Sequence, residues 1–195
     1  MLRENQAFLA YIEGLYQQQE RKDKVIKKHY SEGQKLLNQD EKPTKVILIK
    51  DGITKCFFAG DNDKEYLFEF LGQGEIVGEV EFIKKRNCLC SIEAITEVTA
   101  YAISIDYFSK LIKTDLQLNN LLLDVFAERI INTSTRASYQ QLYTIEHTLS
   151  RLLTLQSEQN LSISKENMAS YLGVTVRSLN RALKKEENKK DFPLT

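Results

Sequence analysis

The feature that most constrains this chain is a change of pattern near residue 105. Before it, short apolar runs are separated by turns rich in Gly, Asp and Asn, whereas the stretch from Asp115 to Leu172 contains no Gly or Pro. Glycine and proline interrupt regular structure, so their spacing indicates short strands first and long helices later. The chain is therefore predicted to be an α+β protein with a β-rich N-terminal part and a helical C-terminal part.

Five apolar runs in the first part have the length of β-strands. They occupy residues 45–50, 53–58 and 65–71, and two more lie within 92–105. Turn residues separate the first runs at 51–52, 60–63 and 72–74. Short strands repeated every 8–12 residues or so predict a sandwich or a barrel between about Lys24 and Ser104.

A long helix is predicted to begin at Asp115, after a short helix from Tyr107 to Ile112 capped by Asp106. Along it, residues spaced four and three apart form a heptad seam: Leu118, Leu122, Val125, Arg129, Asn132, Arg136 and Tyr139. A second stripe runs beside the seam: Leu121, Phe126 and Ile130. A helix with two apolar faces either packs on its own domain and on a partner, or lies inside a monomeric bundle. The first alternative predicts a homodimer built on a parallel pair of central helices.

Residues 164–183 have the pattern of a helix-turn-helix. Ala169 is small where two helices would approach closely, and Gly173 supplies the left-handed backbone of a tight turn. Thr175 is the expected N-cap of the second helix, and Thr144 that of an earlier helix. Apolar residues stand where crossing helices would bury one another: Met168, Leu172, Val174, Leu179 and Leu183.

The first turns of the second helix form the predicted DNA-reading surface, at Thr175, Val176, Arg177, Ser178 and Arg181. Arginine matches the O6 and N7 atoms of guanine, and hydroxyls suit phosphate oxygens. Basic side chains are concentrated in the same part of the chain. Residues 165–195 carry seven basic and four acidic side chains, a net charge of +3, so residues 1–164 carry −3 in a chain whose total is zero. A basic end indicates where a polyanion docks.

Composition narrows the function classes. No apolar run approaches the ~18 residues of a membrane span, and residues 1–20 lack the features of a signal peptide, so we expect a cytoplasmic protein without a membrane partner. Three cysteines without a CxxC motif argue against a disulfide framework and a zinc site. Cys88 and Cys90 are interpreted as small residues inside a barrel, with a redox or metal role as the alternative. HExxH, GxSxG and Walker motifs are absent, so the protein is not predicted to be an enzyme, and no catalytic or metal-binding residue is assigned.

Over roughly residues 24–187 the chain resembles the cyclic-AMP receptor protein/FNR (Crp/Fnr) family of bacterial transcription regulators. The resemblance rests on Lys50-Asp51-Gly52, on the Gly-rich run from Gly72 to Glu79 and on the helix-turn-helix. Residues 76–83 and 171–177 are most similar to the YeiL-type branch. The resemblance implies a cyclic-nucleotide-binding-like β-roll (a double-stranded β-helix) over residues 1–113. It further implies a central dimerisation helix over 114–142 and a helix-turn-helix domain over 143–195.

An effector pocket is also implied by the resemblance. In the family, a Gly-Glu pair and an Arg-Ser or Arg-Thr pair some ten residues later hold the ribose and phosphate of a cyclic nucleotide. Here the second pair falls on Cys88 and Leu89, which cannot neutralise a phosphate, so a small effector other than cyclic AMP is expected. Two readings stay open: Arg86 as a displaced phosphate partner, and Glu79 as a structural carboxylate. The pocket residues implied are Gly78, Glu79, Cys88, Leu89, Asn132 and Thr133.

Three departures from the family pattern bear on function. No cysteine precedes Cys56, which argues against an iron-sulfur cluster, and His29 is interpreted as a surface residue rather than a haem ligand. In the family a two-stranded wing follows the recognition helix, but no strand pair fits residues 184–195. The wing is therefore either lost or truncated, and fewer phosphate contacts predict a lower affinity for DNA.

The predicted function is that of a homodimeric transcription regulator that binds a promoter palindrome and responds to a small effector. Its two half-sites would lie about 34 Å apart. The resemblance implies double-stranded DNA, a second copy of the chain and RNA polymerase as partners. The alternative hypothesis is a β-roll protein-interaction module whose degenerate C-terminus does not bind DNA on its own.

Overall fold

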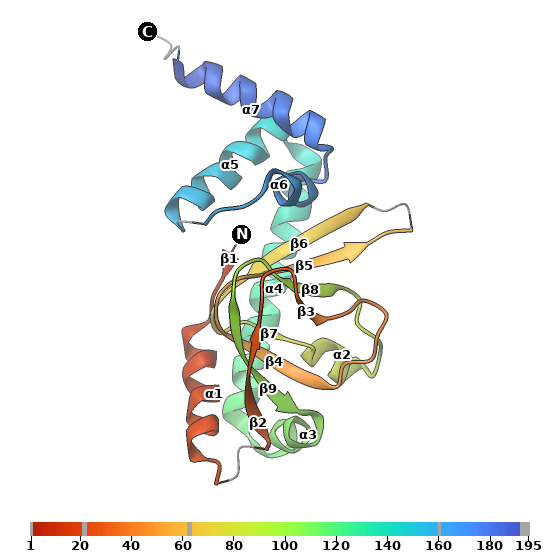
Figure 1. Ribbon diagram of the computed structural model, residues 1–195, viewed down its shortest axis with the longest axis vertical. Helices are drawn as coiled ribbons and strands as arrows, with labels where there is room; N and C mark the ends of the chain where they lie inside the picture. Colours follow the sequence, from red (N-terminus) through yellow and green to blue (C-terminus); the bar gives the residue numbers. More distant parts are fainter. Residues whose placement is uncertain (1, 21–22, 62–63, 160, 192–195) are drawn as a thin grey trace.

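Two β-sheets make up the first part of the computed structural model (Figure 1), which describes residues 2–20, 23–61, 64–159 and 161–191. One sheet has the strand order β1-β6-β5-β8-β3 and the other β2-β9-β4-β7. β1 pairs in parallel with β6, and the other strand pairs of the described residues are antiparallel. The strands are β1 (Leu2–Arg3), β2 (Val25–Tyr30), β3 (Lys35–Leu37), β4 (Lys45–Asp51), β5 (Thr54–Ala59), β6 (Glu65–Leu71), β7 (Ile76–Val77), β8 (Ser91–Ala94) and β9 (Val98–Ser104).

Strand β4 of the second sheet is buried on both faces. In β4, Val46 and Leu48 belong to a core shared with helices outside the roll, whereas Ile47 and Ile49 belong to the core between the two sheets. Successive side chains of a strand point to opposite faces. A strand buried on both faces therefore needs a continuous apolar run, which is what residues 46–49 supply. The expected β-roll is thus confirmed, with its strands close to the predicted positions.

The first sheet is covered on its outer side by the C-terminal helices. Phe57 of β5 and Leu67 and Phe70 of β6 share one core with Leu149 and Leu179, which lie beyond residue 142. A single hydrophobic core therefore joins the roll to the C-terminal part. Burial of these apolar side chains on both partners fixes one part of the chain against the other.

Helices α1 (Gln6–Gln18), α2 (Glu79–Lys84) and α3 (Ile105–Thr114) surround the roll. Helix α1 was not predicted from the sequence. It is capped by Asn5, whose side chain accepts a hydrogen bond from the N–H of Phe8 at 2.9 Å, and it buries Phe8, Leu9 and Ile12. The prediction that Asp106 caps the short helix is wrong, because α3 begins earlier and its N-cap is Ser104.

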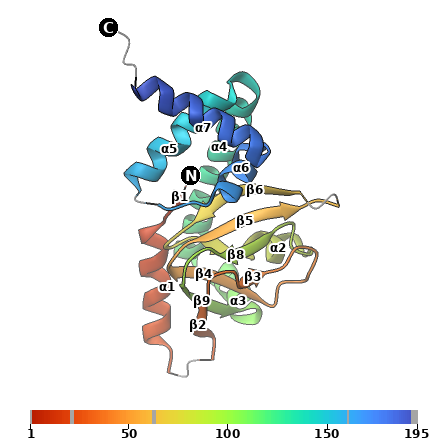
Figure 2. The ribbon, with the colours of Figure 1, turned by 45° about the horizontal axis from the view of Figure 1, so that its top comes forward.

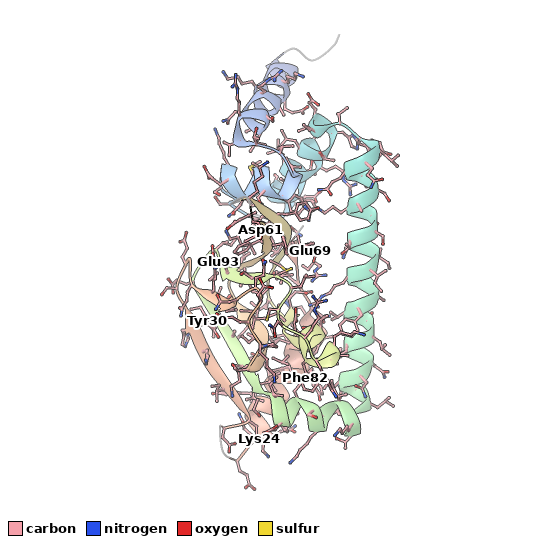
Figure 3. The ribbon with its side chains drawn as sticks, turned by 90° about the vertical axis from the view of Figure 1, so that its right-hand side faces the viewer. Lys24, Tyr30, Asp61, Glu69, Phe82 and Glu93 are labelled. Atoms are coloured by element: carbon pink, nitrogen blue, oxygen red, sulfur yellow. The ribbon has the colours of Figure 1, made fainter. Side chains whose placement is uncertain are left out.

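Helix α4 (Leu116–Leu142) runs alongside both sheets and reaches the C-terminal helices (Figure 3). Its N-cap is Asp115, which accepts a hydrogen bond from the N–H of Leu118 at 3.0 Å. Leu118, Leu122 and Val125 of the predicted seam are buried against the chain's own roll. The seam is therefore an intramolecular contact, and any partner of α4 must meet another face of this helix.

The C-terminal part consists of α5 (Ile145–Glu158), α6 (Lys165–Leu172) and α7 (Val176–Asp191). Figure 2 shows α7 lying against the other two at one end of the molecule. Thr144 caps α5, as predicted. Helix α7 continues through residues 184–191, so the described part of the chain has no strand pair after the recognition helix, and residues 192–195 lie outside it. No described helix is both long enough and apolar enough to cross a membrane.

Candidate nucleic-acid interface and effector cavity

A side-chain hydrogen bond caps the start of each helix of the helix-turn-helix, and a left-handed glycine forms the turn between them. The hydroxyl of Ser164 accepts a hydrogen bond from the N–H of Asn167 at 3.1 Å and begins α6. At the end of α6, Gly173 has a φ of 68°, a left-handed conformation that a side chain would strain. The hydroxyl of Thr175 then accepts from the N–H of Ser178 at 3.2 Å and begins α7. The predicted turn and cap are confirmed.

The two helices cross over a small apolar core. Met168 and Ala169 of α6 are buried together with Leu179 and Ala182 of α7. Ala169 is 2% exposed, so the alanine lies where the helices are closest, as its size predicts. This packing fixes the direction in which the first turns of α7 face.

The structure places most of the predicted DNA-reading side chains on the surface. Thr175, Val176, Arg177 and Arg181 are exposed. Ser178 is partly buried, and its hydroxyl accepts a hydrogen bond from that of Thr175 at 3.1 Å. The two arginines are one helical turn apart, so they lie on one side of α7 and can reach neighbouring base pairs together.

The helix-turn-helix also contacts the β-roll directly. The Ser170 hydroxyl donates to the carbonyl of Glu65 at 2.7 Å, and the ring of Tyr171 stacks on Phe70 with centroids 5.8 Å apart. Arg136 of α4 donates to the carbonyls of Phe68 and Tyr171, as well as to that of Leu67 at 2.7 Å. One side chain of α4 therefore bonds both to the roll and to the first helix of the helix-turn-helix.

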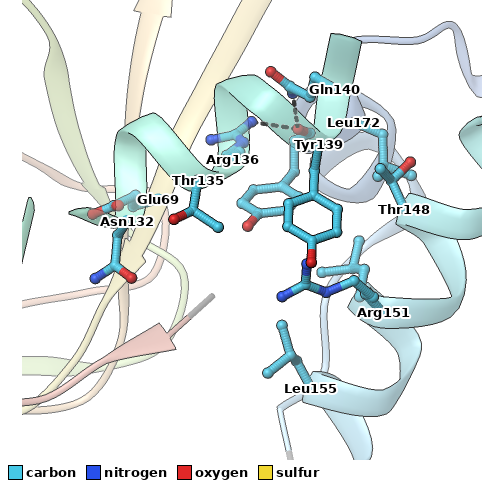
Figure 4. Close-up of a pocket in the computed structure, with 12 residues that line it drawn as sticks. Glu69, Asn132, Thr135, Arg136, Tyr139, Gln140, Thr148, Arg151, Leu155 and Leu172 are labelled. Carbon is cyan, nitrogen blue, oxygen red and sulfur yellow. Dashed lines mark hydrogen bonds between the residues drawn. The ribbon is translucent and has the colours of Figure 1, made fainter. Parts of the chain in front are cut away.

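Arg136 borders a small cavity of about 110 Å³ between α4, α5, α6 and the roll (Figure 4). In this view the guanidinium of Arg136 and the amide of Gln140 point to the carbonyl of Tyr171. The Arg136 guanidinium also lies 4.0 Å from the centroid of the Tyr171 ring. Cation–π contact and three carbonyl acceptors together hold this arginine in one position.

A larger cavity of about 320 Å³ opens in the roll beside α2 and α4. Its lining is mainly apolar, and charged side chains gather at one side. The charged residues of the lining are Arg3, Glu69, Glu79, Glu81, Arg86 and Arg129. This is the type of concave, apolar site with a few polar groups that binds small molecules.

A buried ion-pair network closes part of this cavity. Arg129 of α4 forms a salt bridge with Glu79, and its other nitrogen lies 3.4 Å from a carboxylate oxygen of Glu75. Arg3 bonds to Glu75 at 2.8 Å and lies 2.8 Å from Glu69. Burial raises the pKa of Glu79, which is 1% exposed, although the charge of Arg129 opposes that rise. One Glu79 oxygen, Oε2, has no hydrogen-bond partner.

The structure brings together four of the six predicted pocket residues. Gly78, Glu79, Leu89 and Thr133 line the cavity. Asn132 does not; it borders two other hollows, one of them the small cavity beside Arg136. Arg86, the alternative phosphate partner, lies in the lining and is exposed.

The sequence predicts Cys88 and Cys90 to be small residues inside a barrel. Cys88 is buried, as expected, whereas Cys90 is only partly buried and lines the cavity together with Cys56. Strand β8 begins only at Ser91, so strand alternation does not place Cys88 and Cys90 on one face.

Sequence reasoning also missed the other members of the buried ion-pair network that contains Glu79. Arg3, Glu69 and Glu75 carried no local motif. Arg129 had a signal, because a charged residue at an otherwise apolar seam position indicates a buried partner. Arg136, seven residues later in the same seam, had the same signal.

Comparison with known proteins identifies the class. Residues 27–115 match the family profile described as cyclic nucleotide-binding domain. Three solved structures are similar over most of the chain. One is the c-di-GMP responsive global regulator CLP of Xanthomonas campestris (TM-score 0.75, 18% identity, covering 94% of this chain and 90% of that one). Another, from Eubacterium rectale, is assigned to the Crp/Fnr family of transcriptional regulators (TM-score 0.73, 18% identity, covering 86% of this chain and 80% of that one). The third is TTHB099, a CRP-family transcriptional regulator of Thermus thermophilus (TM-score 0.72, 13% identity, covering 84% of this chain and 85% of that one).

The molecule therefore has the fold of the Crp/Fnr transcription regulators. The profile match covers the roll from β2 to the end of α3. The expected family resemblance is confirmed at the level of the fold. No curated protein sequence matches the chain significantly.

Proposed function

We propose that this chain is a sequence-specific DNA-binding transcription regulator. The observation that carries the proposal is the pair of exposed arginines, Arg177 and Arg181, on the first turns of a recognition helix. Thr175 fixes the start of that helix, and the buried core with α6 fixes its direction. A preorganised pair of guanidinium groups at this position suits guanine edges in the major groove.

The proposed regulator acts as a homodimer through the outer face of α4. Leu116, Leu123 and Ile130 lie seven residues apart on this face and are 73%, 66% and 66% exposed. An apolar heptad stripe on a long exposed helix matches the seam of a two-stranded coiled coil. A second copy of the chain offers the same stripe, so a two-fold pair buries both.

The proposed regulation passes through Arg129. This residue belongs to α4 but bonds to Glu79 in the cavity, so an effector that contacts Glu79 competes with a residue of the dimer helix. A change at the cavity then alters the position of α4 and the separation of the two recognition helices. No arginine stands at the usual phosphate position, and Arg3 and Arg129 are already paired with carboxylates, which supports an effector other than cyclic AMP.

The experiment is enrichment of sequenced genome fragments by the purified chain at ~100 mM salt, where phosphate contacts still contribute to affinity. The test variant is Arg177→Ala/Arg181→Ala. The control is Lys28→Ala, which removes an exposed basic side chain of β2, at the opposite end of the molecule from α7 (Figure 1). Circular dichroism confirms that all three proteins are folded.

A palindromic motif enriched by the wild type and by the control, but not by the double variant, supports the proposal. Equal recovery by all three proteins, or no enriched motif at all, overturns it. In that case the alternative, a protein-interaction module, becomes the working hypothesis.

A further inference from the structure

Two cysteines line the wall of the larger cavity, one in strand β5 and the other in the loop just before β8. Cys56 of β5 lies opposite Ile92 of β8, and Cys90 stands two residues before Ile92. Cys56, Cys90 and Ile92 all line the cavity, so the three side chains face the same space. The strand register and the shared cavity wall therefore bring Cys56 and Cys90 close together, and neither cysteine is fully buried.

We propose that Cys56 and Cys90 form a peroxide-sensitive dithiol, whose oxidation produces an intramolecular disulfide in the cavity wall. Small hydroperoxides are the oxidant class, since the cavity is open to solvent beside Val80 and Leu89, which are 40% and 48% exposed. Two adjacent thiols are the arrangement in which a first oxidised sulfur is captured by a second.

Cys90 is the sulfur that reacts first. The interaction with Cys56 lowers the pKa of the Cys90 thiol and raises that of Cys56; burial and the charge of Glu81 oppose the lowering at Cys90, and the charge of Arg86 supports it. Burial raises the pKa of Cys88 to about 11. Near neutral pH a larger fraction of Cys90 than of Cys88 is therefore ionised, so Cys90 should react with peroxide faster than Cys88.

The reaction balances in two steps. The Cys90 thiolate attacks the terminal oxygen of the hydroperoxide, the O–O bond breaks, and the departing alkoxide takes a proton to become an alcohol. Cys90 is then a sulfenic acid. The Cys56 sulfur attacks it, an S–S bond forms, the S–O bond breaks, and the hydroxide leaves as water with the proton of Cys56. The two thiols lose two electrons in total, and the peroxide gains them.

Disulfide formation changes the cavity. Sulfurs in van der Waals or hydrogen-bonding contact must close to about 2.05 Å, so the backbone before β8 moves toward β5. Leu89 precedes Cys90 and lines the same cavity, so it moves with that backbone. Oxidation therefore narrows the space available to a small molecule.

The test uses the full-length reduced protein treated with hydrogen peroxide, followed by alkylation of the remaining thiols and peptide mass spectrometry. Cys88→Ser is the matched control, and Cys56→Ser and Cys90→Ser are the test variants. We expect the wild type and Cys88→Ser to lose two alkylatable thiols in a peptide linking Cys56 to Cys90, reversed by dithiothreitol. Cys56→Ser should instead accumulate a sulfenic acid at Cys90, which dimedone traps.

Other outcomes overturn the proposal. These are a disulfide that includes Cys88, a disulfide between two chains, or equal rates of thiol loss at Cys88 and Cys90. Peptide mapping of the wild type alone shows which cysteines are joined and how fast each thiol is lost, even if a variant fails to fold. The assay requires no DNA, so its result is independent of the proposed function in transcription.

Discussion

Replacing Arg129 with methionine should be among the most destabilising single substitutions in the roll. Methionine keeps most of the side-chain volume but leaves Glu79, at 1% exposure, without its cationic partner. Glu75 keeps Arg3 at 2.8 Å, so only one carboxylate loses its counter-charge. Breaking one buried pair costs about 3–5 kcal/mol. This is a large part of the 5–15 kcal/mol or so that separates folded from unfolded states in typical domains.

The loss of stability caused by Arg129→Met should depend on pH. Burial already raises the pKa of Glu79 in the folded protein, and loss of Arg129 raises it further. Between the ordinary glutamate pKa and this raised value, the folded state binds more protons than the unfolded state. The stability of the variant therefore falls as pH rises through that window. The difference in the free energy of unfolding between the wild type and the variant is smallest at pH values below the ordinary glutamate pKa. It reaches its full size above the raised pKa of Glu79.

The assay is urea unfolding followed by circular dichroism at several pH values. A double variant, Glu79→Gln/Arg129→Met, leaves a neutral amide in place of the charge and should lose only about 1–3 kcal/mol. Arg86→Met, an exposed arginine of the same cavity, is the control and should stay within about 0.5 kcal/mol of the wild type. Equal losses in the single and double variants, or no pH dependence in the single variant, would refute the assignment of a buried charged Glu79.

Four further predictions concern other parts of the molecule. Gly74→Ala should destabilise the protein by more than about 1 kcal/mol, because φ is +82° and an added Cβ would lie 1.8 Å from a backbone oxygen. Gly14→Ala in α1, where an added Cβ meets nothing within 4 Å, should instead stabilise it by about 0.5–1 kcal/mol; thermal unfolding in which both shift the midpoint the same way would contradict this. Leu123→Glu should leave circular dichroism unchanged but abolish dimers in analytical ultracentrifugation, and a persistent dimer would exclude the proposed α4 seam. Lys185→Ala should raise the pKa of Glu146 from about 2 toward the ordinary value in an NMR titration, whereas an unchanged pKa would exclude their pairing at 2.8 Å.

Features that depend on neighbouring residues in the sequence were predictable. The unbroken apolar run of β4, the cap at Thr144, the left-handed Gly173 and the cap at Thr175 each follow from local geometry or burial. These signals sufficed for the roll and for the helix-turn-helix, because each element's pattern agrees with its final environment.

The use of the two faces of α4 could not be predicted from the sequence. Both the buried seam and the exposed stripe have heptad spacing, and spacing alone does not say which face meets the chain's own roll. The predicted pocket residues Asn132 and Thr133 illustrate the same limit. Adjacent residues on a helix diverge by about 100°, so Thr133 lines the cavity while Asn132 faces other hollows.

Contacts between residues that are distant in the sequence could not be predicted either. The pairing of Cys56 with Cys90 depends on the register of β5 against β8, which no local pattern fixes. Arg3 is separated from Glu75 by 72 residues, yet the two are buried together. Helix α1 was missed because its glutamine-rich sequence has only a short apolar face, at Phe8, Leu9 and Ile12.

The short strand β1 has a consequence for how the chain assembles during synthesis. Leu2 lies 157 residues before Gln159, yet its backbone N–H donates to the side chain of Gln159 at 3.3 Å, and its carbonyl accepts from the same side chain at 3.2 Å. Its strand partner, β6, is also distant in sequence. Contacts of such large sequence separation form late, because a long loop must close before they contribute. Strand β1 therefore reaches its final position only after α5 has emerged from the ribosome, although β1 is synthesised long before that helix.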